Sequence, residues 1–263
     1  MLFEHNISPI LLELGPLAIR WYGLLFASGI LITYFIAKWA FKKDGLKVDL
    51  LDSVAVYLFV GLVIGARLGH VFFYDPVYFL SYPIEILKIW KGGLASHGAA
   101  IGMLIGYVVW LKVNKQKFRT IMNALVVGIP VAAAFVRFGN FFNSEIVGHP
   151  TNSEYGVIFQ RLGEDFPRHP AQLYEGLMSI AVFIVLLIVF KKYHKRLPQM
   201  SLLFLYLFLY FGGRIITEIW KDLQGPFENF PLSMGQLLST IPVGISVVYF
   251  IHLILKKHHE KSK

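Results

Sequence analysis

The chain has 263 residues, of which 56% are hydrophobic and 16% are charged, and its formal net charge is +9 at pH 7. A large soluble helical protein is excluded, because its helices would need polar faces that the long apolar segments of this chain lack. The sequence contains no cysteine, so disulfides, a catalytic thiolate of the chain itself and cysteine-based metal sites are excluded as well.

Seven apolar segments follow one another along the chain. About 20 apolar residues, each rising about 1.5 Å, are needed for a helix to cross a bilayer. We therefore predict an all-α membrane protein with seven transmembrane helices, in a single integral membrane domain of residues 1–263. The predicted spans, of which the third and fourth are short, are Leu17–Phe41, Leu51–Tyr74, Ser96–Val113, Ile121–Phe138, Ala171–Phe190, Met200–Ile219 and Gln236–Leu255. The first span is too long for a cleavable signal peptide.

Lysine and arginine are distributed unevenly between the predicted loops. Most follow the first, third, fifth and seventh spans, at Lys42, Lys43, Lys47, Lys112, Lys115, Lys117, Arg119, Lys191, Lys192, Lys195, Arg196, Lys256, Lys257, Lys261 and Lys263. The other side holds only Arg20, Lys88, Lys91, Arg161, Arg168 and Lys221. The positive-inside rule then predicts an outer N-terminus and an inner C-terminus. Basic loops beside the anionic inner leaflet also account for the net charge without a nucleic-acid partner.

In this orientation, polar residues from six helices fall at one level near the outer face. The second, fourth and sixth helices run outward and carry arginines toward their ends, whereas the third and fifth begin outside with histidines. The six residues are Tyr22, Arg67, His97, Arg137, His169 and Arg214. Charges at membrane depth are costly and usually mark a functional site. We therefore expect a cavity that binds an anion, with titratable imidazoles beside it.

The segment Val136–Gly148 has the highest density of polar groups at a helix end. Taken by itself, Arg137 has a second interpretation, because a basic side chain at the end of a span often extends to the lipid headgroups. Asn140, Asn143 and Glu145 follow it closely, and such an extension needs no fixed partners. The pattern favours a binding site. The longest polar segment, residues 139–170, is predicted to form a small head on the outer side.

The other candidates have alternative interpretations that the sequence leaves open. Arg214 pairs at helical spacing with Glu218 and with Tyr210, so it is either structural or part of an anion clamp. Arg67 needs a counter-charge or an aqueous cavity. Either His97 or His169, taken alone, is compatible with an ordinary residue at a helix start. Two glycine ladders indicate close helix packing, at Gly61, Gly65, Gly69 and at Gly98, Gly102, Gly106.

The segment from Arg137 to Gly148 resembles the signature Gly-Arg-x-Gly-Asn-Phe-x-Asn-x-Glu-x-x-Gly of the bacterial prolipoprotein diacylglyceryl transferases. Further segments similar to that family occur in the same order, at Arg20–Gly23, Gly65–Gly69, Gly92–Gly98, Arg168–Glu175, the trio of Tyr210, Arg214 and Glu218, and Ser233–Gln236. The chain differs from the family pattern at Val136, Ala99 and Asn123, where Gly, Gly and Asp are usual.

This resemblance implies a multi-pass enzyme of the bacterial inner membrane with its active site toward the outer leaflet. Such enzymes transfer the sn-1,2-diacylglyceryl group of phosphatidylglycerol to the lipobox cysteine of a prolipoprotein and release glycerol phosphate. The expected partners are phosphatidylglycerol, the lipobox segment and membrane lipids, with no nucleic acid, no metal and no organic cofactor. The resemblance carries catalytic roles to His97, Arg137 and Arg214. It carries substrate-binding roles to Tyr22, Asn140, Glu145, Gly148, His169 and Tyr210, which Arg67 joins by its position.

The chemistry of these residues suits that reaction. A cysteine thiol with a pKa of about 8.5 attacks well only as the thiolate, so either His97 takes the proton or the arginines stabilise the thiolate. The phosphate leaving group needs positive charge, which Arg137 and Arg214 supply, while Asn140 and Tyr210 donate hydrogen bonds. Glu145 is expected to orient an arginine or the headgroup glycerol. The alternatives are a carrier or flippase for an anionic lipid that uses the same arginine cavity, and a lipid-modifying transferase with another acceptor.

Overall fold

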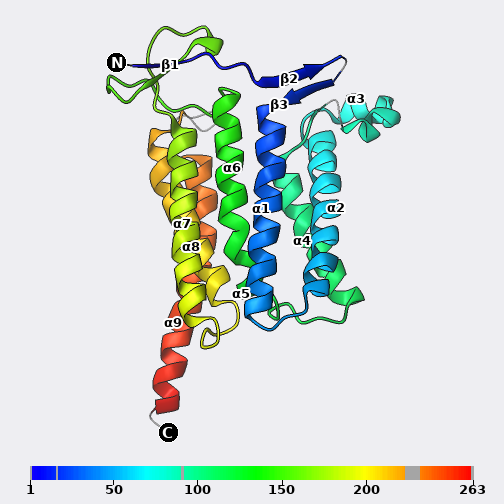
Figure 1. The fold of residues 1–263 in the computed structure, drawn as a ribbon, viewed down its shortest axis with the longest axis vertical. Coiled ribbons are helices and arrows are strands. Elements are labelled where there is room, and N and C mark those ends of the chain that lie inside the picture. Colours follow the sequence, from blue (N-terminus) through cyan, green and yellow to red (C-terminus); the bar gives the residue numbers. More distant parts are fainter. Residues whose placement is uncertain (1, 16, 90–91, 223–231, 262–263) are drawn as a thin grey trace. The chain divides into compact units, whose positions relative to one another are not determined.

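The computed structural model describes residues 2–15, 17–89, 92–222 and 232–261 (Figure 1). Lys91 and Lys263, which contribute to the charge pattern, lie outside these residues. The helices are α1 (Trp21–Lys43), α2 (Val48–Phe73), α3 (Pro76–Ser81), α4 (Ser96–Val113), α5 (Met122–Leu125), α6 (Ile129–Phe142), α7 (Ala171–Tyr193), α8 (Ser201–Thr217) and α9 (Met234–Lys261). Short 3-10 helices are η1 (Pro83–Leu87), η3 (Val126–Gly128), η4 (Gln160–Leu162) and η5 (Glu218–Trp220). The strands are β1 (Phe3–His5), β2 (Ile10–Leu14), β3 (Leu17–Arg20) and β4 (Val157–Phe159).

Six helical segments of the described chain are long and apolar enough to cross a membrane. They are Trp21–Lys43, Val48–Phe73, Met122–Phe142, Ala171–Tyr193, Ser201–Trp220 and Met234–His259. The apolar helix His97–Val113 is shorter. The predicted helical architecture is confirmed, and these helices are consistent with a multi-pass membrane protein, while the count of seven spans and the orientation stay predictions.

The start of the first predicted span differs from the structure. Leu17–Arg20 forms strand β3, which pairs antiparallel with β2, and helix α1 begins only at Trp21. Gly15 between the two strands has a φ of +60°, a left-handed conformation that glycine adopts without steric cost. An apolar run by itself does not distinguish a strand from the first turn of a helix, which is why the hairpin was not predicted.

The fourth predicted span is a broken helix, in which η3 separates α5 from α6. Its beginning is tied to α8 by Asn123, whose Nδ2 donates to the carbonyl of Pro198 at 3.0 Å and whose Oδ1 accepts from the amide of Leu202 at 3.1 Å. Asn123 therefore uses both a donor and an acceptor. An aspartate, which is usual in the family at this position, has no donor for the first of these bonds.

The chain divides into two compact units, Met1–Ala40 with Met122–Lys263, and Phe41–Ile121. In the second unit, the glycine ladders bring α2 and α4 into backbone contact, since a Cβ at Gly65 would overlap the carbonyl oxygen of Gly98 and one at Gly61 that of Gly102. The predicted packing role of the ladders is confirmed. In the first unit, α6 packs on α7, and α8 packs on both α7 and α9.

The segment between α6 and α7 has its own small core, formed by Val147, Val157 and Phe159 with Phe141 against them. Strand β4 of this segment pairs in parallel with the N-terminal strand β1, at the same end of the first unit as the end of α6 and the start of α7 (Figure 1). The segment is therefore structured and attached to the end of α6, where the signature lies. Its predicted place on the outer side of the membrane stays a prediction.

Candidate active site

The signature residues at the end of α6 form a chain of polar contacts. Arg137 Nη1 donates to Oδ1 of the buried Asn140 at 3.3 Å, and Asn140 Nδ2 donates to Glu145 Oε2 at 3.1 Å. Asn143 Nδ2 donates to the second carboxylate oxygen of Glu145, also at 3.1 Å. The orientation of each group thus depends on the next, and Glu145 fixes the amide that Arg137 contacts.

Glu145 lies in an unusual turn. Its neighbours Ser144 and Ile146 have φ values of +56° and +58°, which non-glycine residues rarely adopt, least of all a β-branched one. The backbone amide of Glu145 donates to the carbonyl of Asn140 at 3.0 Å, and its own carbonyl accepts from Gln172 Nε2 at 2.6 Å. Such conformations cost about 1–3 kcal/mol each and persist only where the surroundings hold them.

Gly148 ends the signature where three chain segments meet. Its amide donates to the carbonyl of His169 at 2.9 Å, and it forms an isolated β-bridge with Lys221. A Cβ at this position would overlap the carbonyl oxygen of Trp220 and press on that of His169. The absence of a side chain at Gly148 therefore lets the start of α7 and the end of η5 approach the signature.

Two buried carboxylates and a lysine between them connect the two predicted catalytic arginines. Arg137 Nε forms an ion pair with Glu175 of α7, which is only 3% exposed. Lys221 Nζ lies 3.9 Å from Glu175 Oε1 and 3.4 Å from Glu218 Oε2, and Arg214 Nη2 lies 3.9 Å from the same Glu218 oxygen. We refer to these five residues as the charge network. It alternates cations and carboxylates across α6, α7, α8 and η5.

Glu175 and Lys221 were not predicted as site residues. Glu175 did carry a signal, because a carboxylate inside an apolar span needs a buried counter-charge. Lys221 carried none, since a lysine just after a span is usual. The structure brings both to Arg137 and Arg214.

The two arginines keep donors for which the described part of the chain supplies no hydrogen-bond partner. Within the described residues, Arg214 Nε is buried and has no hydrogen-bond partner, and Arg137 makes its described contacts through Nε and Nη1 only. Buried polar groups almost always have partners. The donors are therefore suited to an anion that binds from outside the chain.

Three further predicted residues lie near these groups. The ring of Tyr22 packs against Gly139, where a Cβ would lie 2.8 Å from Tyr22 Cδ2. The ring of His169 is oriented by Tyr174, whose hydroxyl lies 3.1 Å from Nδ1. Tyr210 lies one turn before Arg214 in α8. These positions fit a site at the ends of α6 and α8 and the starts of α1 and α7.

Arg168 fastens the segment between α6 and α7 beside this site. It binds Glu164 with two hydrogen bonds of 2.5 and 2.6 Å, and its Nη1 donates to Asp222 at 2.9 Å and to the carbonyl of Gly148 at 3.1 Å. The hydrogen bond with Glu164 raises the pKa of Arg168 above its ordinary value. Arg168 thus joins the signature to the chain after α8.

In the other unit, the guanidinium of Arg67 is solvated by backbone carbonyls, which are neutral acceptors. Its Nε donates to Ile86 at 2.8 Å, Nη2 to Glu85 at 2.5 Å, and Nη1 to Gly92 at 2.7 Å and Gly93 at 3.0 Å. The guanidinium is buried, and it holds the connection that leads to α4.

His97 lies exposed in the first turn of α4, which Arg67 helps to position. The amide of Ala95 donates to the carbonyl of Ala66, the neighbour of Arg67, at 2.9 Å. That His97 and Arg67 share a level with Arg137 stays a prediction.

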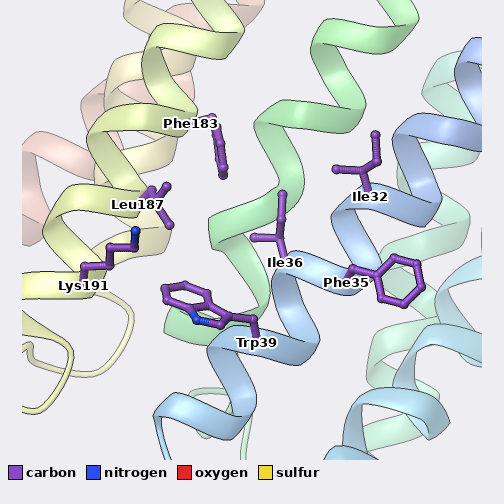
Figure 2. A pocket seen from close by; sticks show the side chains of 7 residues that line it. All are labelled: Ile32, Phe35, Ile36, Trp39, Phe183, Leu187 and Lys191. Atoms are coloured by element: carbon purple, nitrogen blue, oxygen red, sulfur yellow. The ribbon is translucent and has the colours of Figure 1, made fainter.

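A cavity of about 400 Å³ lies along α1 and α7 (Figure 2). Its lining is apolar apart from Lys191, whose Nζ lies 5.9 Å from the ring centroid of Trp39. The complete lining is Ile32, Phe35, Ile36, Trp39, Phe183, Leu187 and Lys191. It contains none of the predicted site residues, so we assign no chemistry to it.

Comparison with known proteins extends the resemblance over the chain. The family described as prolipoprotein diacylglyceryl transferase matches residues 9–252. A protein of Tolumonas auensis named phosphatidylglycerol–prolipoprotein diacylglyceryl transferase is 42% identical over 268 residues, with 100% of both chains covered. Proteins with the same name from Chloroherpeton thalassium and Bacteroides fragilis are each 36% identical, covering 98% and 97% of this chain and 96% of their own lengths.

Proposed function

Because this chain belongs to the prolipoprotein diacylglyceryl transferase family, we propose that it transfers the sn-1,2-diacylglyceryl group of phosphatidylglycerol to the lipobox cysteine of prolipoproteins. The cysteine sulfur bonds to the glycerol carbon of the lipid, the bond from that carbon to the phosphate oxygen breaks, and glycerol phosphate leaves. The observation that carries the proposal is the charge network beside the signature. The relatives carry a transferase name, which gives no support to a carrier or flippase.

Arg137 and Arg214 bind the phosphate in this proposal. Negative charge grows on the phosphate oxygens as the carbon–oxygen bond breaks, and guanidinium groups already in place stabilise it. Glu175 and Glu218 hold the two guanidiniums from the protein side. Among the described residues, Arg214 Nε and the remaining Arg137 donors have no partner, and in this proposal they bind the phosphate. Tyr210 donates a further hydrogen bond.

Asn140 and Glu145 act together. Glu145 accepts from Asn140 Nδ2, so the amide presents its oxygen to Arg137. We assign Glu145 the orientation of Arg137 through this amide, and Gly148 the close approach that keeps the turn beside His169. Asn140 contacts the phosphate side of the lipid headgroup.

The thiol proton goes to His97, or the arginines stabilise the thiolate without a base. His97 is exposed at its helix start, as a group that meets a substrate must be. Tyr22 and His169 line the lipid headgroup. Arg67 serves the reaction by positioning the connection to His97, because its donors bind backbone carbonyls.

The membrane arrangement belongs to the same proposal. The shorter helix α4 is the third of seven spans, the N-terminus lies outside, the C-terminus lies inside, and the active site faces the outer leaflet of the bacterial inner membrane. The basic loops support this orientation.

The direct test is a turnover assay with purified protein, phosphatidylglycerol and a lipobox peptide. Thioether-linked peptide and glycerol phosphate are expected in equal amounts, and neither with a peptide whose cysteine is replaced by serine. Product with the serine peptide would indicate a different acceptor chemistry, and lipid movement without product would indicate a carrier.

Variants separate the residue roles in that assay. Arg137→Ala is expected to abolish turnover. Arg196→Ala is the matched control, because Arg196 is an exposed arginine in the segment after α7. Turnover retained in well-folded Arg137→Ala would remove its phosphate role. His97→Gln distinguishes the two routes for the thiol proton, since activity close to that of the unaltered protein excludes His97 as the base.

A further inference from the structure

The N-terminal strand reaches the signature of the candidate site. Strand β1 pairs in parallel with β4, with Phe3 opposite Val157 and His5 opposite Phe159. Chain termini are usually poorly ordered unless a sheet or a docked helix holds them. Here the pairing delivers one polar side chain, His5, to the core under the end of α6.

His5 is completely buried among aromatic rings. Its ring centroid lies 4.6 Å from that of Phe141 and 5.5 Å from that of Phe159, and its exposed fraction is 0%. Its Nδ1 lies 3.3 Å from Ser144 Oγ, while Nε2 has no hydrogen-bond partner among the described residues. In the tautomer with the proton on Nδ1, the ring donates a hydrogen bond to Ser144 Oγ. The unpaired Nε2 is then an acceptor without a proton.

A phenylalanine would fill the place of His5 without burying an unpaired nitrogen. An unsatisfied buried polar group costs about 1–3 kcal/mol. What the imidazole adds over a phenyl ring is therefore its contact with Ser144, the residue just before Glu145 in the strained turn.

Ser144 is held in its left-handed conformation by few contacts. Its amide donates to the carbonyl of Phe141 at 3.0 Å, and its hydroxyl faces His5. If Ser144 relaxes, the direction of the Glu145 carboxylate changes, because the two are consecutive. Glu145 would then lose Asn140 and Asn143, and Arg137 would lose a fixed partner.

We propose that His5 is a positioning residue, which acts through Ser144 to hold the strained turn and to aim the Glu145 carboxylate at Asn140. The N-terminal strand is thereby part of the apparatus that orients Arg137. This inference rests on the proposed function for its effect on turnover, but its effect on the turn is independent of that function.

Four variants test it. His5→Phe keeps the ring packing and removes the nitrogen, and His5→Asn restores a donor close to the place of Nδ1. Ser144→Gly allows the left-handed conformation without strain, so the turn no longer needs His5. Asn6→Ala is the control, because Asn6 directly follows His5 and has an exposed side chain.

The measurements are turnover and hydrogen exchange of the peptide that covers residues 143–148. His5→Phe is expected to lower kcat/KM about tenfold, as the loss of one hydrogen bond predicts, and to speed exchange in this peptide. His5→Asn is expected to recover both, and Asn6→Ala to change neither. In a protein that already carries Ser144→Gly, His5→Phe should have less than half of its effect on log kcat/KM.

Unchanged exchange in residues 143–148 of His5→Phe would overturn the inference, whatever the turnover. An equal loss of turnover with and without Ser144→Gly would also overturn it, because His5 would then act only on general stability. Absence of turnover in the unaltered protein would count against the proposed function, while the exchange result would still decide the role of His5.

Discussion

Neutralising Glu175 tests whether the charge network holds the catalytic arginine. Glu175→Gln keeps the volume of the side chain and removes the charge between Arg137 and Lys221. Both cations then lose their shared carboxylate. The Nε of Arg137 can donate at most to the neutral amide oxygen of the new glutamine. Lys221→Met removes the opposing charge from the other side, and the double variant removes both.

The distances set the expected size of the coupling between Glu175 and Lys221. Unit charges 3.9 Å apart attract by about 4 kcal/mol at an effective dielectric constant of about 20. Desolvation of both groups and competition from Glu218 reduce the net coupling, for which we expect about 1–2 kcal/mol. The destabilisation caused by removing the buried partner of Arg137 is larger than this coupling. We expect Glu175→Gln to lower the free energy of unfolding by about 3 kcal/mol.

Thermal unfolding in detergent and turnover with phosphatidylglycerol measure these effects. The four proteins of the cycle give the coupling directly, and Glu154→Gln, the same change at an exposed glutamate, is the control. In activity, Glu175→Gln should lower kcat/KM at least 100-fold, because Arg137 loses its orientation. Additive effects of the two changes, or an effect of Glu175→Gln no greater than that of Glu154→Gln, would refute the network.

Three further predictions concern other parts of the structure. Gly148→Ala should lower the melting temperature and expression, because its Cβ would overlap the backbone of Trp220, and Gly244→Ala, with open space around it, should not. Arg67→Lys should cost about 2–3 kcal/mol in unfolding free energy, because one ammonium group cannot reach all of the carbonyls that the guanidinium binds; equal melting temperatures would contradict this. Burial lowers the pKa of His5 below 6.5 in the folded protein, so its contribution to stability is complete above pH 6.5 and is lost as the pH falls toward the lowered pKa. His5→Phe should therefore reduce the loss of thermal stability between pH 7 and pH 5, and an unchanged pH profile would exclude this role.

The sequence alone indicated a membrane protein, most of the helices and the signature at the end of α6, whose catalytic role stays a prediction. Long apolar runs, glycines at a spacing of four residues and a contiguous signature are local features, and each constrains structure without reference to distant parts of the chain. Asn140 and Glu145 could be associated with Arg137 for this reason, since helical spacing and a short turn already bring them together.

Tertiary structure alone decided what fixes these residues. Glu175 and Lys221 reach the site from other elements, His5 reaches it from the N-terminus, and Gly148 is required by carbonyls that lie far along the chain. Strand β3 likewise replaces the expected first helical turn because β2 supplies its hydrogen bonds. The packing of helices and strands determines which residues contact a buried charge or a strained turn. The spacing of residues in the sequence does not contain that information.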